Sequence, residues 1–551
     1  MLRFVSAFAF AALAAGAALA GPTGDEAAAE RNARINAPLP APQAAMKSHV
    51  MFLASDALRG REAGAPEYEI AAQYVASQFY EQGLVPAGDN GSFLQNVPLL
   101  SYKSASKGSF LLNGQPLEFG VEYLPGADPM RDTTKVDAEV VFVGYGIVAP
   151  QFGIDDYKGA KVKGRIVAFF GGAPRGLPGE ERAHFGNAAN KAVIAQQHGA
   201  IGTITLESPV TAKVRPFERM AAGWDSSRMT WANPDGTGHV AAPGAPSLGG
   251  LSMAAAAKLF AGAKRPWDQL AKMTEDDKAK FKPELLKARL AVSLETKREP
   301  VMSWNVAGLL PGSDPTLSKE VVVLTAHLDH IGVGRPDKNG DTINNGAMDN
   351  AVGIASLIEE ARRFKESGKP PRRSILFLAV TAEEKGLVGA DYFANNPTLA
   401  KERLVANVNL DMPILTYKFD DVIVFGAQRS SLGPIVEAAA KDIGVTISPD
   451  PMPDQGLFTR SDHYRFVQQG IPSVFLWPGE AGPGKAAVEK FFAENYHKPS
   501  DEISGPIDWE SGARFIDVNY RIARAIADAE VRPLWNKGDF FGTLYKGPVA
   551  P

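Results

Sequence analysis

The sequence predicts an α/β fold, in which a mostly parallel mixed sheet flanked by helices is interrupted by an inserted β-rich domain. Beyond residue 299, short apolar runs such as SILFLAVT (374–381) alternate with helical patterns, which is typical of a parallel sheet covered on both faces. Residues 127–298 instead combine short strands with Gly turns. The chain has 551 residues, too many for one ordinary core, so we expect more than one domain.

The first twenty residues predict a secretory signal peptide. One early Arg is followed by an apolar Ala/Phe/Leu run and by Ala-Leu-Ala at 18–20, the pattern of a signal cleaved after Ala20. The alternative, a membrane anchor, is weakened by the polar GPTGDEAAAERN that follows at once. We expect an exported protein, periplasmic or extracellular, without stable membrane association. Residues 21–41 are small, charged and Pro-rich, and predict a flexible leader.

The N-terminal part of the main domain is expected over 42–126. Helical patterns run to about Leu84, and strand-like alternation follows over 92–124. The inserted domain is expected over 127–298, with a lysine-rich stretch at 271–290 that predicts a solvated helix. Its histidines (184, 198 and 239) are isolated from other metal-binding residue types, so we expect surface or structural positions for them.

The catalytic part and C-terminal tail are expected over 299–551. The predicted strands cover 321–326, 374–381, 403–410, 420–426 and 473–477. The predicted helices cover 349–364, 385–394, 431–443 and 508–529.

Composition restricts the chemistry. The formal net charge is −4 and no basic run occurs, which argues against a nucleic-acid partner. The chain has no cysteine, which excludes disulfides, thiolate metal ligands and a Cys nucleophile. Any metal must therefore be held by His and carboxylate groups. Four of the eight histidines lie at or after position 327.

Polar side chains of this kind follow successive apolar strands in the main domain: His327 and Asp329, Asp349, Glu383 and Glu384, Asp411, and the late His497. Each has an ordinary alternative when taken alone, such as a helix N-cap for Asp349 or a turn for Asp411. Ligand sites in open α/β sheets lie outside the carboxyl ends of strands. Taken together, these residues predict a hydrolytic metal site, in which one of two adjacent glutamates binds metal and the other serves as a base.

The motifs HLDH, AMDNAVG, AVTAEEKGLVGADYF, NVNLDM and YHKPSDE resemble those of the M28 family of dinuclear zinc exopeptidases. The β-rich insert resembles a protease-associated (PA) domain. The resemblance implies two Zn²⁺ ions per chain. Asp349 would bridge both metals, His327 and Asp411 would bind one, and Glu384 and His497 would bind the other.

The resemblance also implies roles for residues that do not bind metal. Glu383 would be the general base. Asp329 would orient His327 and fix its tautomer. His330 would lie behind the ligands or on the substrate side.

Substrate contacts are less well indicated by the sequence. Some members of the family carry a Tyr where this chain has Phe458, so Arg460 and Tyr464 become candidates for stabilising the oxyanion. The 461–463 segment would form a wall of the pocket. We expect a peptide substrate, and the sequence gives no oligomeric state.

Four functions remain open at this point. The favoured one is an aminopeptidase. A carboxypeptidase or dipeptidase would use Arg460 to bind a terminal carboxylate. A glutaminyl cyclase shares the fold but uses one zinc. A non-catalytic binding protein would lack some of the ligands.

Overall fold

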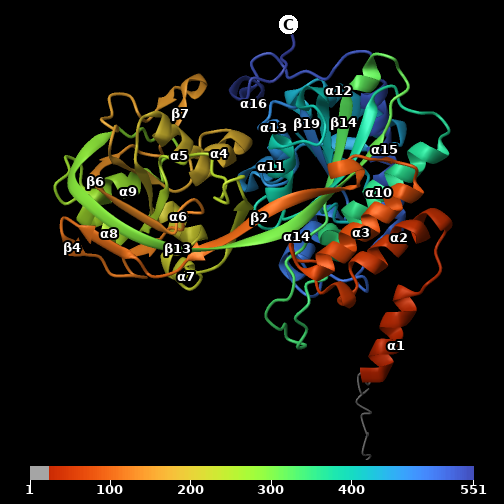
Figure 1. Cartoon of the computed structure of the whole chain (residues 1–551), viewed down its shortest axis with the longest axis horizontal. Helices are drawn as coiled ribbons and strands as arrows, with labels where there is room; N and C mark the ends of the chain where they lie inside the picture. Colours follow the sequence, from red (N-terminus) through yellow and green to blue (C-terminus); the bar gives the residue numbers. More distant parts are fainter. Residues whose placement is uncertain (1–23) are drawn as a thin grey trace, which may run out of the picture.

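The computed structural model describes residues 24–551, and the predicted signal peptide lies outside this range. The chain forms two lobes side by side (Figure 1). Two long strands, β2 (Leu94–Ser104) and β13 (Glu284–Leu310), run from one lobe into the other and pair with each other.

The main lobe contains a mixed sheet. Its strands are, in spatial order, β13, β15 (Ser374–Val380), β14 (Val321–His327), β16 (Leu404–Asn409), β19 (Ser473–Pro478), β17 (Asp421–Phe425) and β18 (Thr446–Ser448). The central four, from β15 to β19, are parallel, while β13 and β17 join them in antiparallel fashion. The predicted mostly parallel mixed sheet is confirmed.

Helices cover both faces of this sheet. Alternate residues of β14 enter different cores, Val322 and Leu324 on one face and Val321 and Val323 on the other, because successive side chains of a strand point to opposite faces. The first face is covered by α2 (Ala41–Leu53), α3 (Pro66–Glu81), α10 (Val352–Glu366), α12 (Leu432–Asp442) and α15 (Trp509–Asp528). The second face is covered by α11 (Val388–Asn395) and α13 (His463–Val467).

The second lobe has its own sheet. Its spatial order is β4 (Gln115–Pro116), β3 (Ser109–Leu112), β13, β6 (Thr133–Phe142), β9 (Ile166–Phe170), β10 (Gly202–Leu206), β12 (Ser247–Leu251) and β5 (Tyr123–Pro125). The four strands from β6 to β12 are parallel. Strands β3 and β5 belong to this sheet although both precede 127, where we predicted that the insert begins.

The helices of the second lobe are short. They are α4 (Gly179–Gly186), α5 (Ala188–Gln197), α6 (Pro209–Val214), α7 (Phe217–Ala221), α8 (Met253–Leu259) and α9 (Trp267–Met273). Helix α4 reaches the main lobe at the 3-10 turn η8 (Pro453–Gln455). Strand β11 (Arg228–Trp231) lies outside the sheet of the second lobe and pairs with β2.

The predicted solvated helix at 271–290 is wrong. Helix α9 ends at Met273, and β13 begins at Glu284 as a strand of 27 residues. The strand buries every second side chain in its first half: Leu286, Ala288, Leu290, Val292 and Leu294. This period of two is the signature of a strand with one buried face, and the lysines on the exposed positions hid it. The predicted domain boundary at 298 lies inside this strand.

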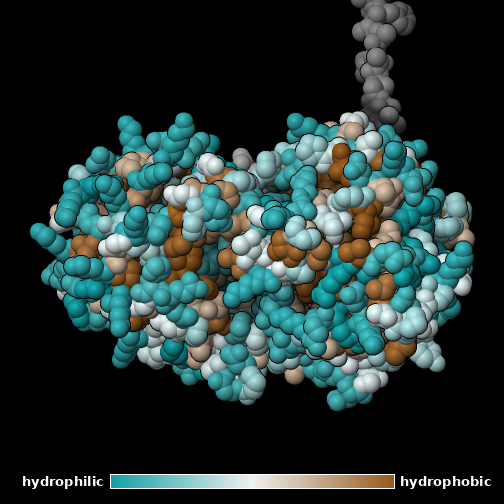
Figure 2. All heavy atoms as spheres, turned by 90° about the horizontal axis from the view of Figure 1, so that it is seen from above, coloured by the Kyte–Doolittle hydropathy of each residue, from teal (hydrophilic) through white to brown (hydrophobic). Residues whose placement is uncertain are grey.

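The predicted flexible leader contains helix α1 (Gly24–Ile35), whose Arg31 forms an ion pair with Glu502. Between residues 24 and 551, none of the helices has the length and apolar character needed to cross a bilayer. The face drawn in Figure 2 is largely hydrophilic, with apolar side chains in separate patches.

Candidate metal centre

The structure brings the predicted metal ligands together at the carboxyl edge of the main sheet. His327 ends β14, Glu383 and Glu384 follow β15, and Asp411 follows β16. Asp349 lies in the irregular turn Ala347–Ala351, just before α10. Within residues 24–551, two groups offer ligand atoms close enough to share an ion, and Asp349 belongs to both: His327, Asp349 and Asp411, and His330, Asp349 and Glu384.

The first group has the spacing of a metal site. Nε2 of His327 lies 3.0 Å from Oδ1 of Asp411 and 3.2 Å from Oδ1 of Asp349. Tetrahedral ligands about 2.1 Å from a zinc ion would be about 3.4 Å apart. Neutral imidazole and carboxylate are the ligands zinc takes when thiolates are absent. The donor set therefore fits a zinc ion.

The second group contains His330, and His497 lies beside it. Nε2 of His497 lies 3.1 Å from Oε2 of Glu384 and 3.3 Å from Oδ2 of Asp349. His330, which we expected behind the ligands, has Nδ1 only 2.7 Å from Oε1 of Glu384. Apart from this contact, neither atom makes a hydrogen bond to any described residue. Buried polar atoms with so few partners are uncommon, and a shared cation would bind both.

Asp329 holds the glutamate pair rather than the imidazole. Its carboxylate accepts the backbone N–H groups of Glu383 (3.0 Å) and Glu384 (3.3 Å). The predicted contact with His327 is made instead by the Asp329 backbone carbonyl, 3.1 Å from Nδ1. The tautomer is still fixed, since a carbonyl only accepts and Nδ1 must donate. Asp329 is therefore a positioning residue, and the predicted contact through its side chain is wrong.

Two further polar side chains orient the ligands, and the sequence singled out only Ser461, as part of a pocket wall. Asp501 accepts the backbone N–H groups of Met348 (2.9 Å) and Asp349 (3.0 Å). Ser461 donates to Oδ2 of Asp411 and accepts from the Asn409 amide. The sequence signal for Asp501 was its place in YHKPSDE, four residues after His497.

Arg61 supports the centre from the N-terminal part of the chain. It is 1% exposed, and its guanidinium donates to the carbonyls of Leu53, Leu328, Asn345 and Gly346. Leu328 and Gly346 lie beside the segments that carry the ligands His327 and Asp349. Burial lowers the pKa of Arg61 to about 10, so the group remains a cation at neutral pH.

Buried carboxylates crowd this edge of the sheet. Burial raises the pKa of Asp462 to about 8, and the carboxylates of Asp411 and Asp329 act in the same direction. Burial also raises the pKa of Glu383 well above its ordinary value, with further contributions from Asp411 and Glu384. Like charges in a low-dielectric site disfavour ionisation of one another. A divalent cation among them would relieve this repulsion.

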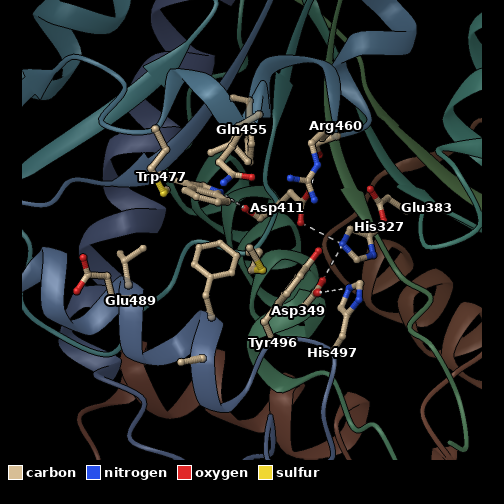
Figure 3. A pocket seen from close by; sticks show the side chains of 18 residues that line it. His327, Asp349, Glu383, Asp411, Gln455, Arg460, Trp477, Glu489, Tyr496 and His497 are labelled. Carbon is tan, nitrogen blue, oxygen red and sulfur yellow. Dashed lines mark hydrogen bonds and ion pairs between the residues drawn. The ribbon is translucent and has the colours of Figure 1, made fainter. Parts of the chain in front are cut away.

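A cavity of about 580 Å³ opens beside the ligands (Figure 3). Glu383 lines it without belonging to either donor group. Much of its lining is apolar, formed by Met412, Met452, Leu457, Phe475, Trp477, Val488 and Phe492. Arg460 also lines it and is drawn close to His327 and Glu383.

Tyr464 does not line this cavity. Its hydroxyl lies 2.6 Å from Nδ1 of His184, a residue of α4 in the second lobe, and its side chain is buried. The prediction of a substrate contact for Tyr464 is wrong, because the first turn of α13 directs the ring toward the second lobe. Of the predicted pocket wall, only Ser461 lines the cavity, while His463 is buried between Phe458 and Phe475.

Residues 305–523 match Peptidase family M28. The sheet with a His and carboxylate centre at its carboxyl edge is the part of the chain that this match covers. Over these residues the chain is similar to this peptidase family.

Curated relatives resemble parts of the chain. Probable leucine aminopeptidase 2 of Aspergillus oryzae is 27% identical over 38% of this chain and 42% of its own length. Leupeptin-inactivating enzyme 1 of Streptomyces exfoliatus is 29% identical over 36% of this chain and 43% of its own length. Aminopeptidase YwaD of Bacillus subtilis is 29% identical over 33% of this chain and 36% of its own length. The chain thus spans less than half the length of these relatives.

Among solved structures, the chain is similar to an aminopeptidase from Aneurinibacillus sp. strain AM-1. The TM-score is 0.48 at 19% identity, over 91% of this chain and 97% of that chain.

Proposed function

We propose that this chain is a two-zinc exopeptidase that removes amino-terminal residues from peptides. One observation carries the proposal: the two oxygens of Asp349 face different donor groups. Oδ1 lies 3.2 Å from His327, and Oδ2 lies 3.3 Å from His497. A carboxylate placed in this way can bridge two metals, which lie about 3.5–4 Å apart in two-metal hydrolases.

In this proposal, His327 and Asp411 would hold one zinc, and Glu384 and His497 would hold the other. Zinc bound there would polarise the scissile carbonyl and lower the pKa of a water molecule. Glu383 takes the proton from the attacking water and returns it to the leaving amine, as a general acid–base must. Asp329 keeps Glu383 in place because its carboxylate accepts the backbone N–H of Glu383.

The cavity supports a preference for peptides whose first residue has a large apolar side chain. Its apolar lining would hold that side chain, since burying a Leu or Phe side chain contributes about 1.5–3 kcal/mol. The free α-amine would lie near the carboxylates that line the cavity, including Glu383. The names of the relatives support this proposal, because two of them are called aminopeptidases.

Arg460 favours a second candidate, a carboxypeptidase or dipeptidase of the same fold. Its side chain lines the cavity and forms no ion pair with another residue between 24 and 551. A guanidinium suits bidentate recognition of a terminal carboxylate.

A substrate panel separates the two candidates. We expect the zinc-loaded protein to hydrolyse leucyl-p-nitroanilide and Leu-Gly-Gly, to lose this activity with a chelator and to regain it with zinc. N-acetyl-Gly-Leu, which has a free carboxylate and a blocked amine, should not be cleaved. Preferential cleavage of this blocked peptide would replace the aminopeptidase proposal by the second candidate.

The two adjacent glutamates are proposed to have different roles, which predicts different defects. Glu383→Gln should retain zinc and lower kcat at least 10²-fold, because a general base contributes about 10²–10⁴-fold. Glu384→Gln should lose part of the zinc. Zinc content by atomic absorption and kcat on leucyl-p-nitroanilide measure both effects. Zinc loss in Glu383→Gln with zinc retained in Glu384→Gln would mean that the roles are exchanged.

A further inference from the structure

A second cavity lies wholly within the second lobe, away from the metal centre. It has a volume of about 560 Å³, within the range of about 300–1,000 Å³ that is usual for small-molecule sites. The ends of β9 and β10 reach it through Gly171, Gly172 and Glu207, and β12 and β5 complete the wall. Because β9 and β10 are parallel, the cavity lies outside the carboxyl ends of a parallel pair, where ligands of α/β sheets bind.

The cavity carries an excess of positive charge in a chain whose net charge is −4. Its cationic side chains are Lys191, Arg215, Arg219 and Arg228, and its only carboxylate is Glu207. Glu207 is already engaged, because its two oxygens accept the N–H groups of Phe217 (3.1 Å) and Met253 (3.2 Å).

The cations differ in what they can offer a ligand. Lys191 is 1% exposed and donates to the carbonyls of Phe170 and Gly172. Burial lowers its pKa to about 7, so its positive charge is partial at neutral pH. The side chains of Arg215, Arg219 and Arg228 are exposed, and none forms an ion pair or hydrogen bond with another described residue. These three guanidinium groups are therefore free to bind an anion.

The remaining wall is apolar. Phe169, Phe217, Met220, Trp224 and Leu251 line the cavity together with Leu124 and Pro125. A fully hydrated ion such as phosphate would leave these surfaces unused. A ligand that joins a carboxylate to an apolar group would use both the arginines and this wall.

We propose that this second-lobe cavity binds the carboxyl-terminal residue of a peptide, with the carboxylate between the arginines and the apolar side chain against Phe217 and Trp224. Arginine binds carboxylates in a bidentate manner, which adds specificity to the charge attraction. The choice of a peptide rests on the proposed exopeptidase function, whereas the choice of a carboxylate with an apolar group rests on the cavity alone.

Binding of a peptide with a blocked amine, which the proposed aminopeptidase does not hydrolyse, tests this proposal. N-acetyl-leucyl-leucine and its carboxyl-terminal amide are titrated into the zinc-loaded protein by isothermal calorimetry. We expect the acid to bind at least tenfold more tightly than the amide. Arg219→Gln and Arg228→Gln should each weaken binding of the acid several-fold. Lys213→Gln is the matched control, because Lys213 pairs with Glu275 and does not line the cavity; it should bind the acid like the unaltered protein.

A variant that fills the cavity localises the binding. A Cβ at Gly250 meets no atom closer than 3.7 Å, the carbonyl oxygen of Thr205, so Gly250→Val can be accommodated in β12. It should abolish binding of the acid while leaving hydrolysis of leucyl-p-nitroanilide unchanged.

Equal binding of acid and amide, or unchanged binding in Gly250→Val, would overturn the proposal. Octanoate that binds more tightly than the peptide acid would assign the cavity to fatty carboxylates instead. Because binding is measured without turnover, a protein that binds the acid but hydrolyses no peptide would refute the proposed function and leave the cavity a carboxylate site.

Discussion

Arg61 stabilises the metal centre without belonging to any ligand motif. Its guanidinium joins α2 to the two segments that carry His327 and Asp349, through backbone carbonyls alone. Carbonyl groups buried without donors destabilise a fold by about 1–3 kcal/mol each. The geometry of the ligands therefore depends on a residue more than 260 positions away in the sequence.

Arg61→Lys should destabilise the protein by about 3 kcal/mol, because one ammonium group cannot reach all four carbonyls and leaves buried acceptors unpaired. It should also weaken zinc binding. Urea unfolding and competition with a zinc chelator measure the two effects. Arg59→Lys is the control: Arg59 is exposed and only pairs with Glu67 at 3.5 Å, so a change below 0.5 kcal/mol is expected. Equal stability of the two variants would contradict the role of Arg61.

His184 predicts a pH-dependent contribution to stability. Burial lowers its pKa to about 4, while the unfolded chain has the ordinary value of about 6.5. The neutral form is thus favoured in the folded state. The contribution of His184 to the free energy of unfolding is fully present above pH 6.5. It is lost as the pH falls from about 6.5 to about 4, by at most about 3 kcal/mol.

Melting temperatures of metal-free protein between pH 4 and 8 check this prediction. His184→Gln should show a shallower decline below pH 6.5 than the unaltered protein, since Gln cannot bind the proton. His198→Gln, at an exposed position, should follow the unaltered protein. Parallel curves for all three proteins would show that His184 does not titrate in this range.

The sequence could predict candidate ligands whose position follows from the ends of strands. His327, Asp349, Glu384 and Asp411 converge as expected, because parallel strands end at one edge. It could not predict the contact of His330 with Glu384, which depends on the direction of one side chain after a turn.

At the scale of elements, the second lobe contacts the wall of the metal-site cavity. Helix α4 packs against η8 (Pro453–Gln455), whose Gln455 lines that cavity. Arg429 strengthens the contact through ion pairs with Glu180 and Glu181 of α4 and with Asp539. The position of this wall therefore depends on an element outside the main lobe.

Gly179→Ala should disturb this wall. Its Cβ would meet the Pro453 carbonyl oxygen at 2.4 Å, so α4 or η8 must move. We expect KM for leucyl-p-nitroanilide to rise several-fold, with zinc content unchanged. Gly186→Ala is the matched control on the same helix, since its Cβ meets nothing within 3.9 Å. An unchanged KM in Gly179→Ala would show that the position of this wall does not depend on α4.

The elements themselves were predictable to different degrees. Strands such as β14 and β15 are uninterrupted apolar runs, so their limits could be predicted within one or two residues. The first half of β13 buries only one face and exposes charged side chains on the other, and its lysine content favoured a helix. A strand of this kind is recognised by alternation rather than by composition.

At the scale of the whole molecule, β2 and β13 connect the two lobes as continuous strands. Strand β13 pairs with β15 in the main lobe and with β3 and β6 in the second lobe. Trp231 adds a hydrogen bond of 2.8 Å from β11 to Asp391 of the main lobe. Neither sheet can unfold without breaking a strand of the other.

Calorimetry should therefore show one unfolding transition for the metal-free protein, with equal calorimetric and van't Hoff enthalpies. A proline at Ala291, which pairs with Leu111 and Asp137 on its two sides, would remove a hydrogen bond from the shared strand. This variant should lower the melting temperature of both lobes together. Two resolved transitions in the unaltered protein would show that the lobes unfold independently.

The shared strand also limits how such a protein can change during evolution. A module inserted in a surface loop can be lost or exchanged by recombination at its two ends, because chain termini of such modules lie close together. Here the end of the second lobe falls in the middle of β13. A crossover at that point must preserve the register of pairing in both sheets, since a slip of one residue would turn every buried side chain to the opposite face. We expect the two lobes to be inherited together, and loops such as 335–341, which lie outside both sheets, to vary in length more freely.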